Sequence, residues 1–239
     1  MCNEKIKVEK HSFINNKVNK EIIYKIKIYT QKSSTNIDMG YAMYFVKAGL
    51  LSIGGSYLES NYFPNFFPGM VESSTALAGQ TKAFSLVIFS MAAYNFWLFM
   101  HGMGVGSARR KFMEKAKKDG EKDVDARYSM PNLYVAGNTA NSKAFNCHQR
   151  SHQQQLETVS LFNFSTLLSG LVFPVTSAFT GFMYLFSRRA WTNGYANDEG
   201  NAMKRYSHPL AKEVWTLLLS QIILMGLVGF KIGGFFNYW

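Results

Sequence analysis

A long uncharged stretch constrains this chain more than any other feature of its sequence. Residues 83–106, AFSLVIFSMAAYNFWLFMHGMGVG, contain no Lys, Arg, Asp or Glu. A helix needs about 20 predominantly apolar residues to cross the hydrocarbon core of a bilayer. Basic residues follow in Ala108-Arg109-Arg110-Lys111, as is typical of a helix that leaves the membrane on its basic side. The stretch therefore predicts a transmembrane helix and an integral membrane protein.

Composition and charge favour the same class of protein. Hydrophobic residues make up 47% of the 239 residues and charged residues only 17%, which is low for a soluble domain. A net charge of +11 could indicate a nucleic-acid binder, but Lys and Arg gather at the edges of apolar segments instead of alternating with aromatic residues on one face. We therefore expect contact with the lipid bilayer and no nucleic-acid partner.

Three more apolar segments predict an all-α, four-helix membrane bundle. Residues 214–230 carry no charge, and Ser207 is expected to cap a helix with Pro209 in its first turn. Residues 156–173 and 175–196 are two further predicted spans, the second of which ends in polar residues.

A proline separates the second and third predicted spans. Pro174 ends the first of these two helices, because the residue before a proline disfavours helical geometry. The turn is too short to contain another domain, so the two helices are expected to form an antiparallel hairpin. If one helix runs from Lys143 to Phe173, it is about 45 Å long at ~1.5 Å per residue, longer than the ~30 Å hydrocarbon core. Its N-terminal half must lie at or outside the membrane interface.

That N-terminal half carries a polar stripe. One helical face presents polar groups at positions i, i+4, i+7, i+8 and i+11, namely Asn146, Arg150, Gln153, Gln154 and Glu157. Ionisable groups that enter a membrane usually face a cavity and mark a site. The alternative is that the helix protrudes into water and the stripe is solvated.

A second stripe lies on the third predicted span. Arg188, Trp191 and Tyr195 follow at i, i+3 and i+7, near the same membrane face as the first stripe because the hairpin is antiparallel. Two arginines and one carboxylate suit a small ligand with several carboxylates and an amine, because guanidinium groups bind carboxylates in bidentate geometry. We expect an anionic, peptide-like ligand.

No metal site is expected. His148 and His152 have helical i, i+4 spacing, but Gln149 stands where a zinc-protease motif needs Glu. The two cysteines, Cys2 and Cys147, form no CxxC pair and require no oxidising compartment.

The N-terminal region allows two topologies. The connections over 109–143 and 197–212 are basic, so both should face the cytosol or its equivalent. Four spans would place the Lys-rich N-terminal tail on the opposite side. A fifth crossing at residues 41–58 would return it to the basic side, whereas the alternative is a helix lying along the interface. Residues 61–70, NYFPNFFPGM, are expected to form an interfacial loop.

The motif FNCHQRSHQQQLETVSLF, residues 145–162, resembles the second-helix signature of the MAPEG superfamily, the membrane-associated proteins in eicosanoid and glutathione metabolism. It is similar above all to the type 3 microsomal glutathione S-transferases, whose pattern is F-N-C-x-Q-R-A-H-Q-N-T-L-E. The matching residues are Phe145, Asn146, Cys147, Gln149, Arg150, His152, Gln153, Leu156 and Glu157. Arg188, Gly194 and Tyr195 match the third-helix pattern. The resemblance covers residues 82–235, which predicts an N-terminal extension over 1–80 and a MAPEG-like membrane domain over 81–239.

The resemblance implies a homotrimer that binds glutathione between neighbouring subunits near the cytosolic face. Glutathione is the expected co-substrate. By position, Arg150 and Arg188 would hold its carboxylates, and Glu157 its amine. The remaining predicted binding residues are Asn146, His152, Gln154, Trp191 and Tyr195. The family's catalytic arginine follows the third helix, where Lys204 and Arg205 are the candidates.

The function implied is a membrane-bound glutathione S-transferase or peroxidase that acts on lipophilic electrophiles or lipid hydroperoxides, in the endoplasmic reticulum or a mitochondrial membrane. Gln154 replaces an asparagine of the pattern, Trp191 replaces a tyrosine, and the loop before Lys204 is longer than in the family. These differences, with the N-terminal extension, leave an alternative: a non-catalytic accessory subunit of a larger membrane complex.

Overall fold

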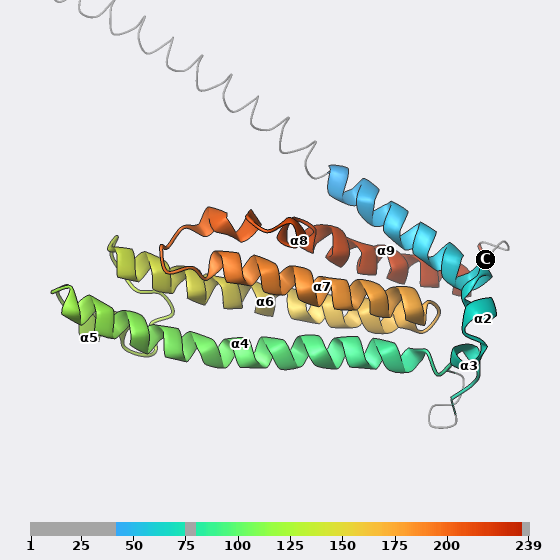
Figure 1. Ribbon diagram of the computed structural model, residues 1–239, viewed down its shortest axis with the longest axis horizontal. Helices are drawn as coiled ribbons and strands as arrows, with labels where there is room; N and C mark the ends of the chain where they lie inside the picture. The colour runs from blue at the N-terminus through green and yellow to red at the C-terminus, as the bar shows by residue number, and fades with distance from the viewer. Residues whose placement is uncertain (1–41, 75–79, 236–239) are drawn as a thin grey trace, which may run out of the picture. The chain divides into compact units, whose positions relative to one another are not determined.

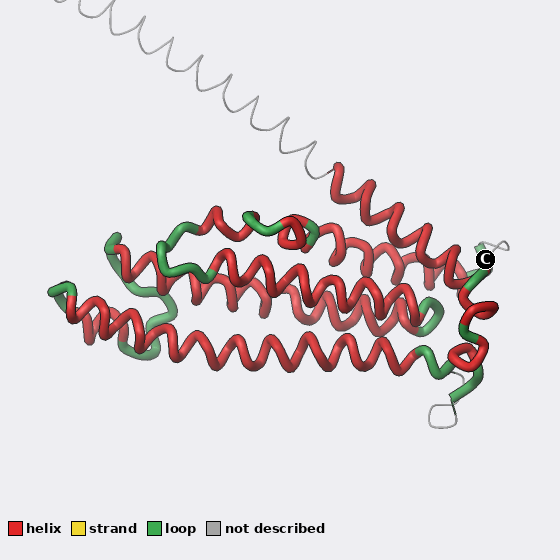
Figure 2. The backbone as a smooth tube through the Cα atoms, in the orientation of Figure 1, coloured by secondary structure: helices red, strands yellow, loops and turns green. Residues whose placement is uncertain are grey.

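Four long helices form the body of the molecule. The computed structural model describes residues 42–74 and 80–235, and within them the chain is helical, with a single isolated β-bridge between Ser73 and Thr81. The long helices are α4 (Phe84–Lys118), α6 (Ala140–Gly170), α7 (Pro174–Tyr195) and α9 (Val214–Ile232). α4 and α9 each pack against both α6 and α7 (Figure 1). The predicted all-α class is confirmed for the described residues, and Figure 2 shows the helices joined by turns and by longer loops.

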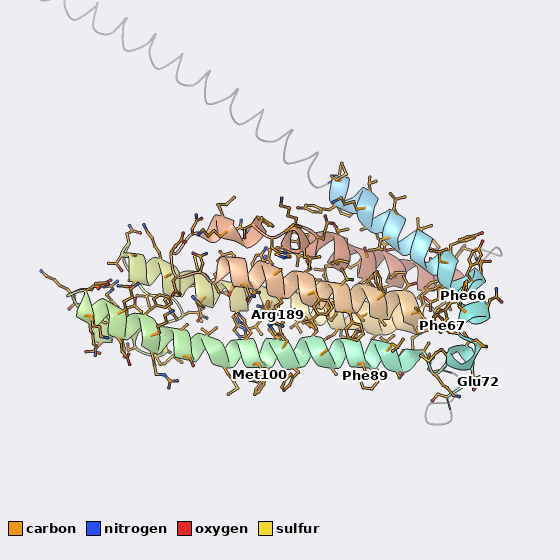
Figure 3. The ribbon with its side chains drawn as sticks, in the orientation of Figure 1. Phe66, Phe67, Glu72, Phe89, Met100 and Arg189 are labelled. Carbon is orange, nitrogen blue, oxygen red and sulfur yellow. The ribbon has the colours of Figure 1, made fainter. Side chains whose placement is uncertain are left out.

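Two helices qualify as membrane spans by length and composition. Among the described residues these are α4 and α9, which correspond to the first and last predicted spans. On α4, large apolar side chains such as Phe89 and Met100 are exposed and lie along the edge that faces away from the other helices (Figure 3). In water such a surface would be costly, whereas a bilayer covers it. The chain therefore has the features of a membrane protein.

The hairpin of α6 and α7 follows from local sequence signals. Thr139 is the N-cap of α6, and its side chain accepts a hydrogen bond from the backbone N–H of Ser142. Pro174 occupies the first turn of α7, where its missing N–H leaves no unsatisfied donor. Only three residues, 171–173, separate the two helices, so the predicted antiparallel hairpin is present.

The two basic connections meet at one end of the bundle. The first contains α5 (Val124–Tyr128), and the second contains η1 (Ala202–Tyr206) and α8 (Pro209–Lys212). Lys111 at the end of α4 forms a 2.6 Å ion pair with Asp198, which joins them. The expected cap at Ser207 is wrong: His208 is the N-cap of α8 and accepts from the N–H of Leu210, because the chain turns there before α9 begins.

The interior of the bundle contains both aromatic and polar layers. The rings of Tyr94, Phe162 and Tyr184 pack together in the middle, with centroids 4.6–5.3 Å apart. Nearer the hairpin turn, Gln221 of α9 accepts from Ser169 of α6 and donates to Thr180 of α7, all fully buried. These buried polar groups are mutually satisfied. They also lower the mean hydropathy of α6 and α7, because inward-facing Ser and Thr replace apolar residues.

A helix over residues 42–61 precedes two very short helices, α2 (Phe63–Phe66) and α3 (Pro68–Val71). The loop expected over residues 61–70 is therefore wrong in part, because Pro64 and Pro68 each start a helical turn. Residues from Val46 onward belong to the same compact unit as the four long helices. The division of the chain after residue 80 stays a prediction, and the Lys-rich tail before residue 42 lies outside the described residues.

Candidate functional site

An ion pair marks the exposed part of the α6 stripe. Arg150 donates to both carboxylate oxygens of Glu157, from Nη1 to Oε1 at 2.6 Å and from Nη2 to Oε2 at 3.3 Å. The two side chains are two helical turns apart on one face, and 39% and 47% of their surfaces remain exposed. The hydrogen bond to Glu157 raises the pKa of Arg150. The pair therefore presents a fixed positive and a fixed negative charge at an accessible surface.

The polar stripe also holds the first connection in place. The side-chain amide of Asn146 accepts from the backbone N–H of Val135 and donates to its carbonyl, both at 2.9 Å. Two turns further along α6, Gln153 accepts a hydrogen bond from the Tyr134 hydroxyl. Both polar atoms of the Asn146 side chain thus form hydrogen bonds with the backbone of Val135. Its predicted role in ligand binding stays a prediction, and the structure gives it a positioning role.

Arg188 lies in a closed cage between α6, α7 and α9. Its guanidinium donates to Oγ1 of Thr158 at 2.7 Å and to Oε1 of Gln154 at 3.3 Å. The rings of Tyr184, Trp191 and Trp215 lie 5.7, 5.1 and 5.7 Å from its central carbon, within cation–π range. Neither the Arg188 side chain (0% exposed) nor that of Trp191 (1%) reaches the surface. Of the three residues of the predicted second stripe, Arg188 and Trp191 therefore lie in the core, whereas Tyr195 is partly exposed.

The C-terminal end of α7 is joined to η1. The Arg205 guanidinium lies over the rings of Tyr195 and Tyr206 at 5.4 and 5.0 Å, and Tyr195 in turn contacts Trp191, with ring centroids 5.0 Å apart. Arg205 is only half-buried. It is therefore a cation with a fixed position beside the site.

The other catalytic candidate, Lys204, occupies a different environment. Its ammonium forms an ion pair with Glu199 in the exposed loop between α7 and η1. Between the two candidates, Arg205 is the one that the fold places against the α7 stripe. Gly194 makes this approach possible, because a Cβ at that position would meet the backbone carbonyl oxygen of Lys204 at 2.3 Å.

The histidines lie on the side of α6 that faces α4. His152 contacts His101, with ring centroids 5.5 Å apart, and its ring lies against Gly102. His148 packs on Phe112, and burial lowers its pKa. Within the described ranges, no group of three His, Cys, Asp or Glu side chains is arranged for a metal ion. His152 lines a cavity of about 670 Å³ together with Gln149 and Arg110.

Some contributors to the site were not identified from the sequence. Thr158 accepts the strongest hydrogen bond to Arg188, and its place one turn after Gln154 on the α6 stripe was a usable signal. Trp215 had no such signal, because it belongs to an apolar span and reaches Arg188 only through tertiary packing. Tyr134 lies in a connection without periodicity, so only the structure reveals its contact with Gln153.

The comparison with known protein families agrees with this arrangement. The model of the MAPEG family matches residues 87–226, from the first turn of α4 to the middle of α9. The match thus includes most of both candidate spans, the whole α6–α7 hairpin and every predicted site residue. Because it extends over more than half of the sequence, the chain belongs to the MAPEG family.

Proposed function

We propose that this protein is a membrane-bound glutathione S-transferase or peroxidase acting on lipophilic electrophiles or lipid hydroperoxides. Within its family, the residue pattern of α6 favours a relationship with the type 3 microsomal glutathione S-transferases. The family includes membrane glutathione transferases and other proteins, so the activity is argued from the site.

The observation that carries the proposal is the exposed Arg150–Glu157 pair. The γ-glutamyl end of glutathione has a carboxylate and an ammonium group on the same carbon. A carboxylate binds Arg150 through the guanidinium fork, and an ammonium binds Glu157. Binding would break the Arg150–Glu157 ion pair and form two new ones, between Arg150 and the ligand carboxylate and between Glu157 and the ligand ammonium. Breaking the original pair costs little free energy, because both of its side chains are partly exposed to water.

The chemistry requires a thiolate. A free cysteine thiol has a pKa of about 8.5, so glutathione is mostly protonated at neutral pH, and a nearby cation stabilises the ionised form. Arg205 is the residue proposed for this role, since the rings of Tyr195 and Tyr206 fix its position. The thiolate then attacks an electrophilic carbon to form a thioether, while the bond from that carbon to its leaving group breaks and the leaving group departs with the electron pair; in an addition to an activated double bond, the neighbouring carbon takes up a proton from water instead. With a hydroperoxide, two glutathione molecules give the disulfide, an alcohol and water.

The expected assembly is a homotrimer with glutathione between neighbouring subunits, in the endoplasmic reticulum or a mitochondrial membrane. Lipophilic substrates would then reach the thiolate from the bilayer, and glutathione from the aqueous side. Chemical crosslinking in mild detergent should yield a trimer.

The test is glutathione-thiolate absorbance together with conjugation of a small electrophile by the purified protein. Arg150→Ala and Arg205→Ala should abolish the thiolate signal and reduce conjugation by at least about tenfold, because a lost transition-state contact of ~1.4 kcal/mol is tenfold in rate. Arg189→Ala is the matched control, since Arg189 is exposed on α7 beside Arg188. No thiolate signal in the parent, with all variants equal to it, would contradict the proposal.

One observation favours a second function, that of a non-catalytic accessory subunit in a larger membrane complex. Arg188 and Trp191, two of the predicted binding residues, are shielded from any ligand by the bundle itself. Purification in gentle detergent from the native membrane should then yield stoichiometric foreign subunits. A homotrimer without other subunits would count against this second function.

A further inference from the structure

The helix over residues 42–61 presents a face of small residues to the bundle. Ala48, Ser52 and Ser56, each one turn from the next, are completely buried. Gly55 approaches α7 so closely that a Cβ there would meet Cγ2 of Thr176 at 2.6 Å. Small residues are what allow the backbones of membrane helices to come this close. The helix is therefore packed as an integral member of the bundle.

Polar contacts fix the direction of this helix. Near its start, Lys47 forms a 2.7 Å ion pair with Glu213, which directly precedes α9. In the middle, the Ser52 hydroxyl donates to the carbonyl of Ser220 in α9 at 2.9 Å. Lys47 contacts Glu213, and Ser52, later in the helix, contacts Ser220, later in α9. The helix therefore runs parallel to α9, away from the basic connections and toward the α6–α7 turn.

The end of the helix is anchored at that turn. The Glu59 carboxylate accepts the backbone N–H groups of Val175 and Thr176, both at 2.8 Å, in the first turn of α7. A carboxylate at a helix N-terminus satisfies otherwise unpaired donors and interacts favourably with the helix dipole. From Lys47 to Glu59, the helix thus runs alongside the bundle from the start of α9 to the turn between α6 and α7.

The outward face of the helix is apolar. Val46, Leu50, Ile53 and Leu58 are exposed, Leu50 to 72%. A helix that lies along the interface shows a charged or polar face to water, whereas this one turns its polar side inward and its large apolar side chains outward. Its mean hydropathy is modest because it contains Lys47, Glu59 and Asn61, and because small residues form its inner face.

We propose that residues 42–61 cross the membrane as a fifth helix. At ~1.5 Å per residue the helix is about 30 Å long, enough for the hydrocarbon core. Exposed Phe66 and Phe67 follow in α2 and directly after it, between this helix and the start of α4 (Figure 3). Aromatic residues are enriched where chains meet the membrane surface. The chain would thus enter the helix on the side of the basic connections, as the positive-inside rule requires.

Protease protection in sealed microsomes tests the topology. The full chain carries an epitope tag before Met1. In a background in which Cys2 and Cys147 are replaced by Ser, single cysteines at Lys122→Cys and Asn65→Cys mark the two sides through a membrane-impermeant maleimide. Five crossings predict that protease removes the tag from the side on which position 122 is labelled. A tag that is digested only from the side of position 65 would overturn the proposal.

A pair of adjacent glycines tests the packing. Gly55→Leu should lower the melting temperature in detergent by several degrees, because its side chain would collide with Thr176. Gly54→Leu is the matched control, because a Cβ at Gly54 would meet nothing within 4 Å. Equal melting temperatures for the two variants would overturn the close packing of this helix on α7.

Discussion

Arg188 in α7 donates a 2.7 Å hydrogen bond to Thr158 in α6, although no part of the arginine side chain is exposed. A buried cation normally requires a carboxylate partner. Here two neutral oxygens and the faces of three aromatic rings surround the guanidinium instead. The planar group fits between rings where a lysine ammonium would not. The contact therefore connects α6, α7 and α9 at one point.

Arg188→Lys should destabilise the protein although it keeps the charge. The lysine would lose the two-point hydrogen bonding and the ring contacts, and hydrogen bonds to charged groups contribute about 1.5–3 kcal/mol each. We expect a loss of about 2–4 kcal/mol in the free energy of unfolding, measured by thermal or denaturant unfolding in detergent. Arg189→Lys, at the exposed neighbouring position, should change it by less than about 0.5 kcal/mol. Similar losses for both variants would rule out the caged role of Arg188.

Gly194→Ala should displace η1. The new Cβ would lie 2.3 Å from a backbone oxygen that cannot rotate away, so the segment carrying Arg205 must shift. Displacements near 1 Å at a catalytic group can cost about a hundredfold in rate. We expect conjugation of a small electrophile to fall by at least tenfold. Gly226→Ala in α9, where a Cβ meets nothing within 4 Å, should retain the parent rate, and equal rates for both would contradict this geometry.

Much of the fold could be predicted from local sequence signals. The uncharged residues 83–106 correspond to α4 from its N-cap onward, and Pro174 marks the turn between α6 and α7. The register of the α6 stripe was also predictable, because helical periodicity alone places Arg150 and Glu157 on one face. Their direct pairing follows from that register.

The environment of the second stripe could not be predicted. Helical periodicity places Arg188, Trp191 and Tyr195 on one face of α7. It does not indicate which residues of other helices cover that face. The covering group is Trp215, which comes from a helix with no polar pattern. Similarly, nothing in the sequence indicates that Asn146 is engaged by Val135. Such contacts depend on tertiary packing and on loop conformations that lack periodicity.

The stability of the basic end should fall as the solution becomes acidic. Burial lowers the pKa of His148 below its usual value of 6.5, so the folded state favours the neutral ring. That preference contributes stability above about pH 6.5 and is lost as the pH falls through the lowered pKa, because the unfolded chain binds the proton first. His148→Gln should therefore flatten the decline in melting temperature below about pH 6.5. An unchanged decline would show that His148 does not titrate in this way.

Glu157→Gln separates ligand binding from structural support. The Arg150–Glu157 pair is nearly half exposed, and such pairs contribute at most about 1 kcal/mol to stability. The melting temperature should therefore hardly change. Glutathione should bind up to about fivefold more weakly, since its ammonium loses a charged partner worth up to ~1 kcal/mol at this exposed position. Isothermal titration of glutathione into the purified protein measures this, with Glu199→Gln, in the exposed ion pair with Lys204, as the matched control. A lower melting temperature with unchanged affinity would assign the pair to structure instead of recognition.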